Sequence, residues 1–159
     1  MLRAVLFPVE VLAYALWEGG MVALALVAPV VFQVVPSRDL AGRVFGGILG
    51  QLFPLIYACG AAILLSGLIQ RRFGHVEIVR YVLVALMLAV ALYTGIVVVG
   101  EMNGIQAALP APIEALPLDS PPRARFDDLH RLSERLIGAD VGLGLVLLPY
   151  LVRRRPVVA

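Results

Sequence analysis

The chain has 159 residues, of which 61% are hydrophobic, and a formal net charge of +2. Soluble domains are about half apolar, so this composition indicates a membrane protein and argues against a soluble enzyme. All 13 basic residues are arginines, scattered at the ends of apolar runs, whereas a nucleic-acid-binding protein has a clustered basic face. The single cysteine, Cys59, excludes an internal disulfide and a metal site made of cysteines alone.

Four apolar runs predict four membrane-spanning helices. A helix of about 20 apolar residues crosses the hydrocarbon core of a bilayer. Charged residues are absent from 44–70 and 81–100, and 136–152 contains only Asp140. The first run, 4–37, contains only Glu10 and Glu18 and has no small-x-small exit, so we expect it to stay as a span and not to be a cleaved signal peptide.

The predicted fold is an all-α, integral membrane, up-down four-helix bundle that forms a single transmembrane domain over residues 1–159. The predicted spans are 6–34, 42–70, 78–102 and 123–152. The last span becomes long enough because its helix begins in the polar stretch before the apolar run.

The connections predict the topology. Residues 36–41 and 71–77 form short links, which join antiparallel neighbours. The link from Asn103 to Arg125 is long and contains five prolines, so we expect an exposed, irregular loop. Arginines lie directly against the span ends at 71–72 and 153–155. The positive-inside rule then predicts a bacterial cytoplasmic membrane protein with both termini in the cytoplasm and the proline-rich loop outside.

A strip of small residues predicts close helix packing. Gly42, Gly46 and Gly50 repeat every four residues along one face of the second span. Such a strip lets another helix approach closely. That helix belongs either to the same bundle or to a second copy in a homo-oligomer. Gly138 and Gly142 repeat the pattern at the start of the fourth span.

Four segments carry a resemblance to a known family: "ALWEGG", "VAPVVFQ", "AGRVFGGILGQLFPLIY" and "FDDLHRLSERL". In these segments and their order, most of the chain resembles the transmembrane protein 205-like family, a membrane domain of unknown function. The resemblance implies a four-span fold and no settled activity. The chain departs from the family at Glu18, which is usually apolar, and at Ile137, which is often asparagine. The motif positions are Trp17, Gly19, Gly20, Pro29, Phe32, Gly42, Phe53, Pro54, Phe126, Leu129, His130 and Ser133.

Polar side chains inside the spans are predicted to form two layers. A charged group alone in hydrocarbon costs at least about 2.5–3.5 kcal/mol, so these side chains should face the bundle interior. The lower layer, about 20 Å from the cytoplasmic arginines at 1.5 Å per residue, consists of Glu18, Tyr57, Thr94 and Asp140. The upper layer, at about 30 Å, consists of Gln51, Glu101, His130 and Ser133.

These layers allow different functions. In the first interpretation, Glu18 and Asp140 carry protons or cations, and the chain is a small transport or permeation module. In another, both carboxyl groups are protonated and hydrogen-bonded, and the chain is a structural or accessory membrane protein. No catalytic residue, nucleic-acid partner or cofactor is predicted, and "GGILG" is not a dinucleotide fingerprint because it lies inside an apolar span.

A third, distant alternative is a redox protein with haem or a metal ion on His130. His75 lies in the cytoplasmic loop, about 30 Å from His130 by helix rise, so two-histidine haem ligation within one chain is not expected. A metal site made of His130, Glu101 and Asp127 would lack the close ligand spacing of a strong zinc motif.

The segment "FDDLHRLSERL" is predicted to form the first turns of the fourth helix, which lie in water and the headgroup region at the outer side of the bundle. His130, Ser133 and Asp140 recur at three- and four-residue steps, as do Phe126 and Ile137, which predicts one inward face. We expect His130 to face inward at the outer mouth, bonded to Glu101, Gln51 or the long loop. There it either gates or organises access to the carboxyl groups or only ties the start of the fourth helix to its neighbours.

Overall fold

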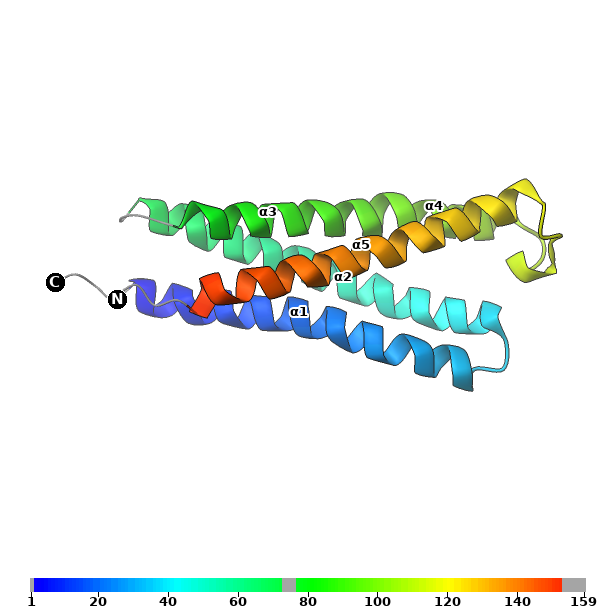
Figure 1. Cartoon of the computed structure of the whole chain (residues 1–159), viewed down its shortest axis with the longest axis horizontal. Coiled ribbons are helices and arrows are strands. Elements are labelled where there is room, and N and C mark those ends of the chain that lie inside the picture. Colours follow the sequence, from blue (N-terminus) through cyan, green and yellow to red (C-terminus); the bar gives the residue numbers. More distant parts are fainter. Residues whose placement is uncertain (1, 73–76, 153–159) are drawn as a thin grey trace.

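The computed structural model describes residues 2–72 and 77–152. Its long helices are α1 (Leu2–Val34), α2 (Arg38–Arg71), α3 (Ile78–Leu92), α4 (Val99–Ala108) and α5 (Pro121–Val152). A π-helical segment, η1 (Tyr93–Val98), joins α3 to α4 without a break, and a short 3-10 helix, η2 (Ile113–Ala115), lies in the proline-rich connection. The predicted all-α four-helix bundle is confirmed (Figure 1).

Four helical rods are long and apolar enough to cross a membrane, so the protein is a multi-pass membrane protein. They are Val5–Val34, Asp39–Arg71, Ile78–Ala108 and Pro121–Val152. The third rod extends past the predicted limit at residue 102, because η1 and α4 continue the helix.

Local signals in the sequence fix the ends of two rods. The Ser37 side chain accepts a hydrogen bond from the Leu40 backbone N–H at 3.1 Å, which caps the start of α2. Asp39 in the first turn and Arg71 in the last turn complement the helix dipole. Pro121 begins α5, where a missing backbone donor has no cost.

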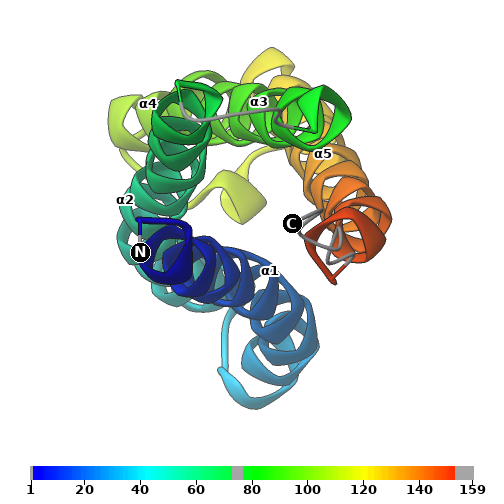
Figure 2. The same ribbon diagram turned by 90° about the vertical axis from the view of Figure 1, so that its left-hand side faces the viewer.

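The rods follow one another around the bundle in the order α1, α2, α3, α5 (Figure 2). Helix α5 packs mainly against α3 and less against α1. The bundle has one end where α1 begins and α5 ends, and another end where α1 and α5 diverge (Figure 1). We call the first the terminal end and the second, which carries η2, the loop end.

The apolar core lies on the facing sides of the rods. Its largest fully buried apolar side chains include Trp17 and Met21 of α1, Ile56 and Ile63 of α2, and Met87 of α3. The outer faces remain apolar and exposed, as expected of helices that lie in lipid.

The proline-rich connection folds over the loop end and is less irregular than predicted. Ile113 of η2 is buried, and η2 contacts both α2 and α5. The Arg123 guanidinium donates hydrogen bonds to the carbonyl oxygens of Glu114 and Leu116, at 3.1 and 2.7 Å. These bonds fasten the connection to the start of α5.

Candidate functional site

Two carboxyl groups meet where α1 packs against α5, and we call Glu18 and Asp140 the central carboxyl site. Glu18 is 8% exposed and Asp140 is 1% exposed. The Trp17 indole Nε1–H donates to Asp140 Oδ2 at 2.9 Å, and the Tyr14 hydroxyl donates to the Gly144 carbonyl oxygen at 2.8 Å. Both bonds cross from α1 to α5, so they hold the two helices together at this level.

Glycines make room for the central carboxyl site. A Cβ atom at Gly144 would collide with the Glu18 carboxyl group, and one at Gly60 of α2 would lie 2.8 Å from the Trp17 ring. Trp17 therefore lies closely between α2 and α5, and the Glu18 side chain lies directly on the backbone of α5. Substitution of either glycine would displace a side chain of the site.

Three carboxyl oxygens of the central carboxyl site are buried without a hydrogen-bond partner. They are both oxygens of Glu18 and Oδ1 of Asp140, for which the described side chains, those of residues 5–37, 39–72 and 77–152, supply no donor. The two groups lie near each other, because Trp17, the neighbour of Glu18, bonds to Asp140, and Glu18 lies against Gly144, four residues after Asp140. Two ionised carboxylates in this position would carry a large unfavourable energy, because buried charges require partners. The site is therefore suited to take up a proton or a cation.

The two hydroxyl groups of the predicted lower layer lie elsewhere. The Thr94 hydroxyl is buried and donates to the Val90 carbonyl oxygen of its own helix at 2.8 Å. The Tyr57 hydroxyl donates to the Ala91 carbonyl oxygen at 3.5 Å and lies against Gly95. The lower layer is thus divided between carboxyl groups at α1 and α5 and hydroxyl groups at α2, α3 and η1.

The predicted upper layer does not assemble around the interior. Gln51 is exposed, and Glu101 is exposed and forms two hydrogen bonds with Arg125, at 2.7 and 3.0 Å. Ser133 is buried, but its hydroxyl donates to the backbone oxygen of His130 at 2.7 Å. Gln51 and Glu101 therefore face away from the carboxyl groups.

The expected inward position of His130 is wrong. The His130 side chain is 46% exposed, and its Nε2 lies 3.3 Å from Glu134 of the same helix instead of near Glu101. The buried face of α5 passes through Leu129, Ser133 and Asp140. His130 follows Leu129 directly, and one residue corresponds to about 100° of rotation on a helix, which turns it out of the bundle.

His130 is paired with one carboxylate, Glu134. Within the described parts of the chain, no three His, Cys, Asp or Glu side chains come together in a way that could hold a metal ion. His75 falls outside the described residues.

The positions that carry the family resemblance do not form one cluster. Trp17, Phe53, Leu129 and Ser133 are buried, and Gly20 lies against Leu52. A Cβ atom at Gly19 or Gly42 would have open space. Phe126 is half-buried, and the remaining positions are exposed: Gly19, Pro29, Phe32, Pro54 and His130.

A second polar cluster was not predicted from the sequence. It joins Glu10 of α1, Ser66 and Gln70 of α2, and Arg80 and Tyr81 of α3, and we call it the Glu10 network. Ser66, Gln70 and Tyr81 donate to Glu10 Oε1 at 2.6, 2.7 and 3.0 Å. Arg80 forms an ion pair with Glu10 Oε2 and lies 5.0 Å from the centre of the Tyr81 ring.

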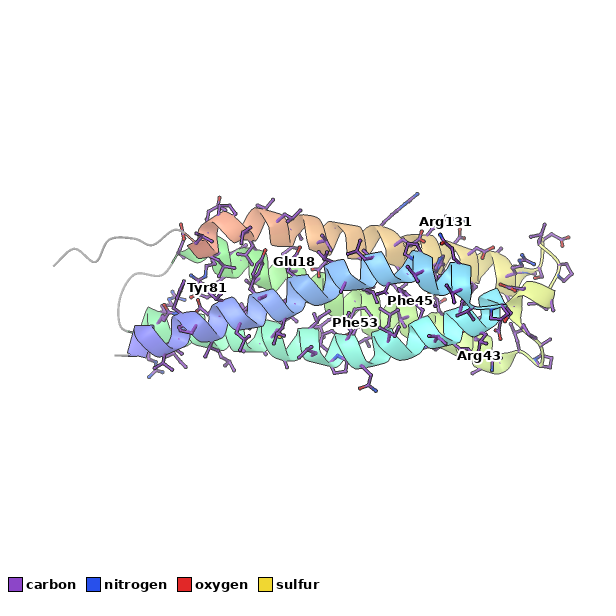
Figure 3. All side chains as sticks on the ribbon, turned by 90° about the horizontal axis from the view of Figure 1, so that it is seen from below. Glu18, Arg43, Phe45, Phe53, Tyr81 and Arg131 are labelled. Atoms are coloured by element: carbon purple, nitrogen blue, oxygen red, sulfur yellow. The ribbon has the colours of Figure 1, made fainter. Side chains whose placement is uncertain are left out.

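The two clusters lie at different levels of the bundle. In Figure 3, Tyr81 of the Glu10 network lies near the terminal end, Glu18 lies farther along, and Arg43 and Arg131 lie toward the loop end. One sequence signal could have revealed this arrangement: Glu10 and Glu18 are the two charges of the first apolar run, eight residues apart, which puts them near one helix face.

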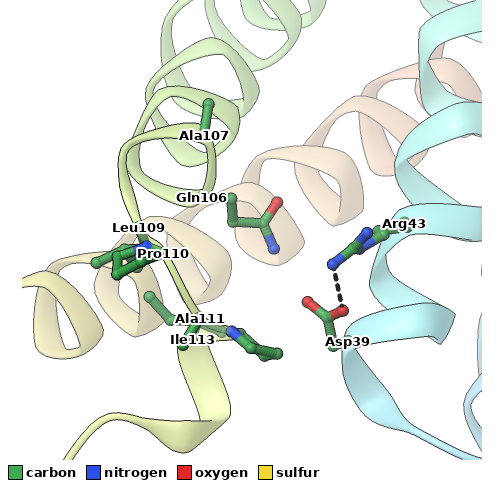
Figure 4. Close-up of a pocket in the computed structure, with 9 residues that line it drawn as sticks. Asp39, Arg43, Gln106, Ala107, Leu109, Pro110, Ala111 and Ile113 are labelled. Carbon is green, nitrogen blue, oxygen red and sulfur yellow. Dashed lines mark ion pairs between the residues drawn. The ribbon is translucent and has the colours of Figure 1, made fainter.

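A pocket of about 340 Å³ lies at the loop end, beside the proline-rich connection (Figure 4). Its polar wall contains an ion pair between Asp39 and Arg43 at 2.8 Å and the side chain of Gln106. The remaining wall is formed by Ala107 and the segment from Leu109 to Ile113. The pocket is separate from both carboxyl clusters.

Residues 12–109, more than half of the chain, match the family described as a domain of unknown function, DUF4149. The chain belongs to this family. The DUF4149 match includes Glu18 but neither Glu10 nor Asp140. No curated protein and no solved structure matches the chain. The narrower resemblance to the transmembrane protein 205-like family stays a prediction.

Proposed function

We propose that the protein is a small membrane transport module that carries protons on Glu18 and Asp140. One observation carries this proposal: three buried carboxyl oxygens of the central carboxyl site have no donor in the described chain. An isolated ionised carboxylate is unstable in an apolar interior, and a bound proton removes its charge.

A proton suits the central carboxyl site better than a divalent metal ion does. Calcium takes six to eight oxygen ligands, and magnesium requires a near-ideal octahedron. The central carboxyl site offers three free carboxyl oxygens, while the neighbouring Gly144 carbonyl already accepts the Tyr14 hydroxyl. Uptake and release of a proton need only a carboxyl oxygen.

Proton flux in liposomes tests the proposal. We expect wild-type protein to acidify or alkalinise the vesicle interior along a pH gradient, and Glu18→Gln and Asp140→Asn to lower the initial rate about tenfold or more, because the amide cannot carry the proton. The readout is a trapped pH-sensitive dye. Glu134→Gln and Asp128→Asn are the matched controls, since both are exposed carboxylates of α5 and should leave the rate unchanged.

Two results of the flux measurement would refute the proposal. Wild-type flux no greater than that of empty vesicles, or equal flux in Glu18→Gln and wild type, would refute proton transport through the central carboxyl site. Thermal unfolding in detergent should accompany each measurement, so that a loss of rate is not confused with a loss of folded protein.

A structural or accessory role is the second candidate function. The bond from Trp17 to Asp140 favours it, because a buried hydrogen bond between α1 and α5 stabilises the bundle whether or not a proton moves. In this case Glu18→Gln is almost without effect, since glutamine resembles a protonated glutamate. Trp17→Phe then lowers the free energy of unfolding by about 1–3 kcal/mol by leaving an Asp140 oxygen without a donor.

We place the protein in a bacterial cytoplasmic membrane with both termini in the cytoplasm. Arg71 and Arg72 support this orientation, because they follow the second span directly and the positive-inside rule is strongest in short loops. The Glu10 network would then lie on the cytoplasmic side of the central carboxyl site.

A further inference from the structure

The Glu10 network differs from the central carboxyl site in how its carboxyl group is bound. Glu10 is 1% exposed, and one of its oxygens accepts three hydrogen bonds, from Ser66, Gln70 and Tyr81. Its other oxygen is paired with Arg80. Hydrogen bonds and an adjacent cation stabilise an ionised carboxylate. Both oxygens of Glu10 therefore have polar partners, whereas three carboxyl oxygens of the central carboxyl site have none among the described side chains.

The Glu10 network also reaches the surface of the bundle through Arg80. The Arg80 side chain is 12% exposed and lies near the start of α3, so the network reaches the surface at the terminal end. Glu10 and Glu18 are eight residues apart on α1, about 12 Å along the helix axis. Tyr14 lies four residues from each, so its hydroxyl is a polar group of the same helix face between them.

We propose that Glu10 is the proton-exchange residue of the terminal end and that Arg80 keeps it ionised at rest. This inference rests on the proposed proton transport by the central carboxyl site. A proton that leaves the Glu18 carboxyl group binds one Glu10 oxygen, and Arg80 loses its anionic partner for that time. The proton then passes from Glu10 to water, and the ion pair between Glu10 and Arg80 forms again.

The groups around Glu10 agree with this role. From α3 it faces the cation Arg80 and the hydroxyl of Tyr81, and from α2 it faces the neutral side chains of Ser66 and Gln70. Among the side chains of residues 5–37, 39–72 and 77–152, Arg80 is the one charged group paired with Glu10. Loss of this single cation should therefore decide whether Glu10 is ionised.

Infrared difference spectroscopy tests the state of Glu10 without any transport measurement. In Arg80→Gln at neutral pH, we expect a new carboxylic acid C=O band that is absent from wild type and from the double variant Arg80→Gln/Glu10→Gln. Arg125→Gln is the matched control: it removes the cation from Glu101, which is exposed and stays ionised in water, so no new band should appear. Absence of the band in Arg80→Gln, or its persistence in the double variant, overturns the inference.

Proton flux then tests the exchange role. We expect Glu10→Gln to lower the rate about tenfold, with Glu101→Gln as the matched control at wild-type rate. The double variant Arg80→Gln/Glu10→Gln removes both charges of the ion pair and shows the same loss if Glu10→Gln alone is poorly folded. Suppose that Glu18→Gln abolishes flux but Glu10→Gln and the double variant keep the wild-type rate. Glu10 is then not the exchange residue, whereas the proposed function stands. Should wild type show no flux, the proposed function itself fails.

Discussion

Gly67 and Gly50 lie in the same helix, α2, but only Gly67 is in close contact with another rod. A Cβ atom at Gly67 would collide with the Tyr81 ring, which belongs to the Glu10 network, whereas a Cβ atom at Gly50 would have open space. An aromatic ring held by neighbours cannot move aside as the end of a flexible side chain can. The Glu10 network therefore depends on a residue that contributes no polar atom to it.

This difference gives a stability prediction. We expect Gly67→Ala to lower the free energy of unfolding by about 1–3 kcal/mol, because the extra methyl group displaces Tyr81. Gly50→Ala, the matched control, should be neutral or raise it by up to about 1 kcal/mol, since alanine favours helix over glycine. Unfolding in detergent, followed by circular dichroism, measures both. Equal effects of the two substitutions would contradict the close packing at Gly67.

Sequence reasoning could place residues along a helix axis but not around it. Counting residues from the span ends predicted Glu18 and Asp140 at one level, and in the structure both lie where α1 contacts α5. The same count does not tell which of two neighbouring residues faces the bundle, and the buried one is Leu129, not His130. The sequence does not predict the cluster around Glu10, because its partners Ser66 and Gln70 are polar residues at the end of another span. They meet Glu10 only when α2 packs against α1.

At the scale of single elements, helix α2 has one face that the bundle does not use. Gly42, Gly46 and Gly50 were expected to approach another helix, yet a Cβ atom at each would meet nothing within 4 Å. Close packing within the bundle instead uses other glycines of α2, Gly60 and Gly67. Contact of this strip with a second copy of the chain therefore stays a prediction. The strip is open to such a contact, because no other described helix packs closely against it.

Oligomer measurements test this strip. If it is a dimer face, Gly46→Leu should weaken dimerisation in liposomes about tenfold, which corresponds to about 1.4 kcal/mol, because a large side chain keeps the helices apart. Ala61→Leu, on an exposed part of the same helix, should leave the dimer fraction unchanged. Single-molecule photobleaching counts the copies, and a wild-type protein that is monomeric at all densities would contradict the prediction.

At the scale of the whole molecule, the rods are longer than the hydrocarbon core is thick. They span 30 to 33 residues, about 45–50 Å, against about 30 Å of hydrocarbon. The excess explains why Glu101 and His130 can be exposed near the loop end without the cost of a charge in lipid. The apolar runs were enough to predict the four helices, but not the folding of the proline-rich connection, which depends on contacts of Ile113 and Arg123 with distant parts of the chain.

The up-down topology has a direct test. In a Cys59→Ala background, a cysteine at exposed Ala115 in η2 and one at exposed Arg72 after α2 lie at opposite ends of the bundle. We expect a membrane-impermeant thiol reagent added outside bacterial cells to label Ala115→Cys and not Arg72→Cys. Labelling of Arg72→Cys alone would reverse the proposed orientation, and labelling of both from one side would contradict the topology.

The chain contains a single tryptophan, and it is the residue whose indole N–H is bonded to Asp140. When the indole ring is excited selectively, the emission therefore comes from one ring, which is bonded to the central carboxyl site. A change in the charge of Asp140 or Glu18 alters the electric field across the excited indole ring, and with it the emission wavelength and lifetime. The protein thus carries its own optical indicator: emission recorded during a pH jump would follow the occupancy of the carboxyl groups in real time, with no dye and no label.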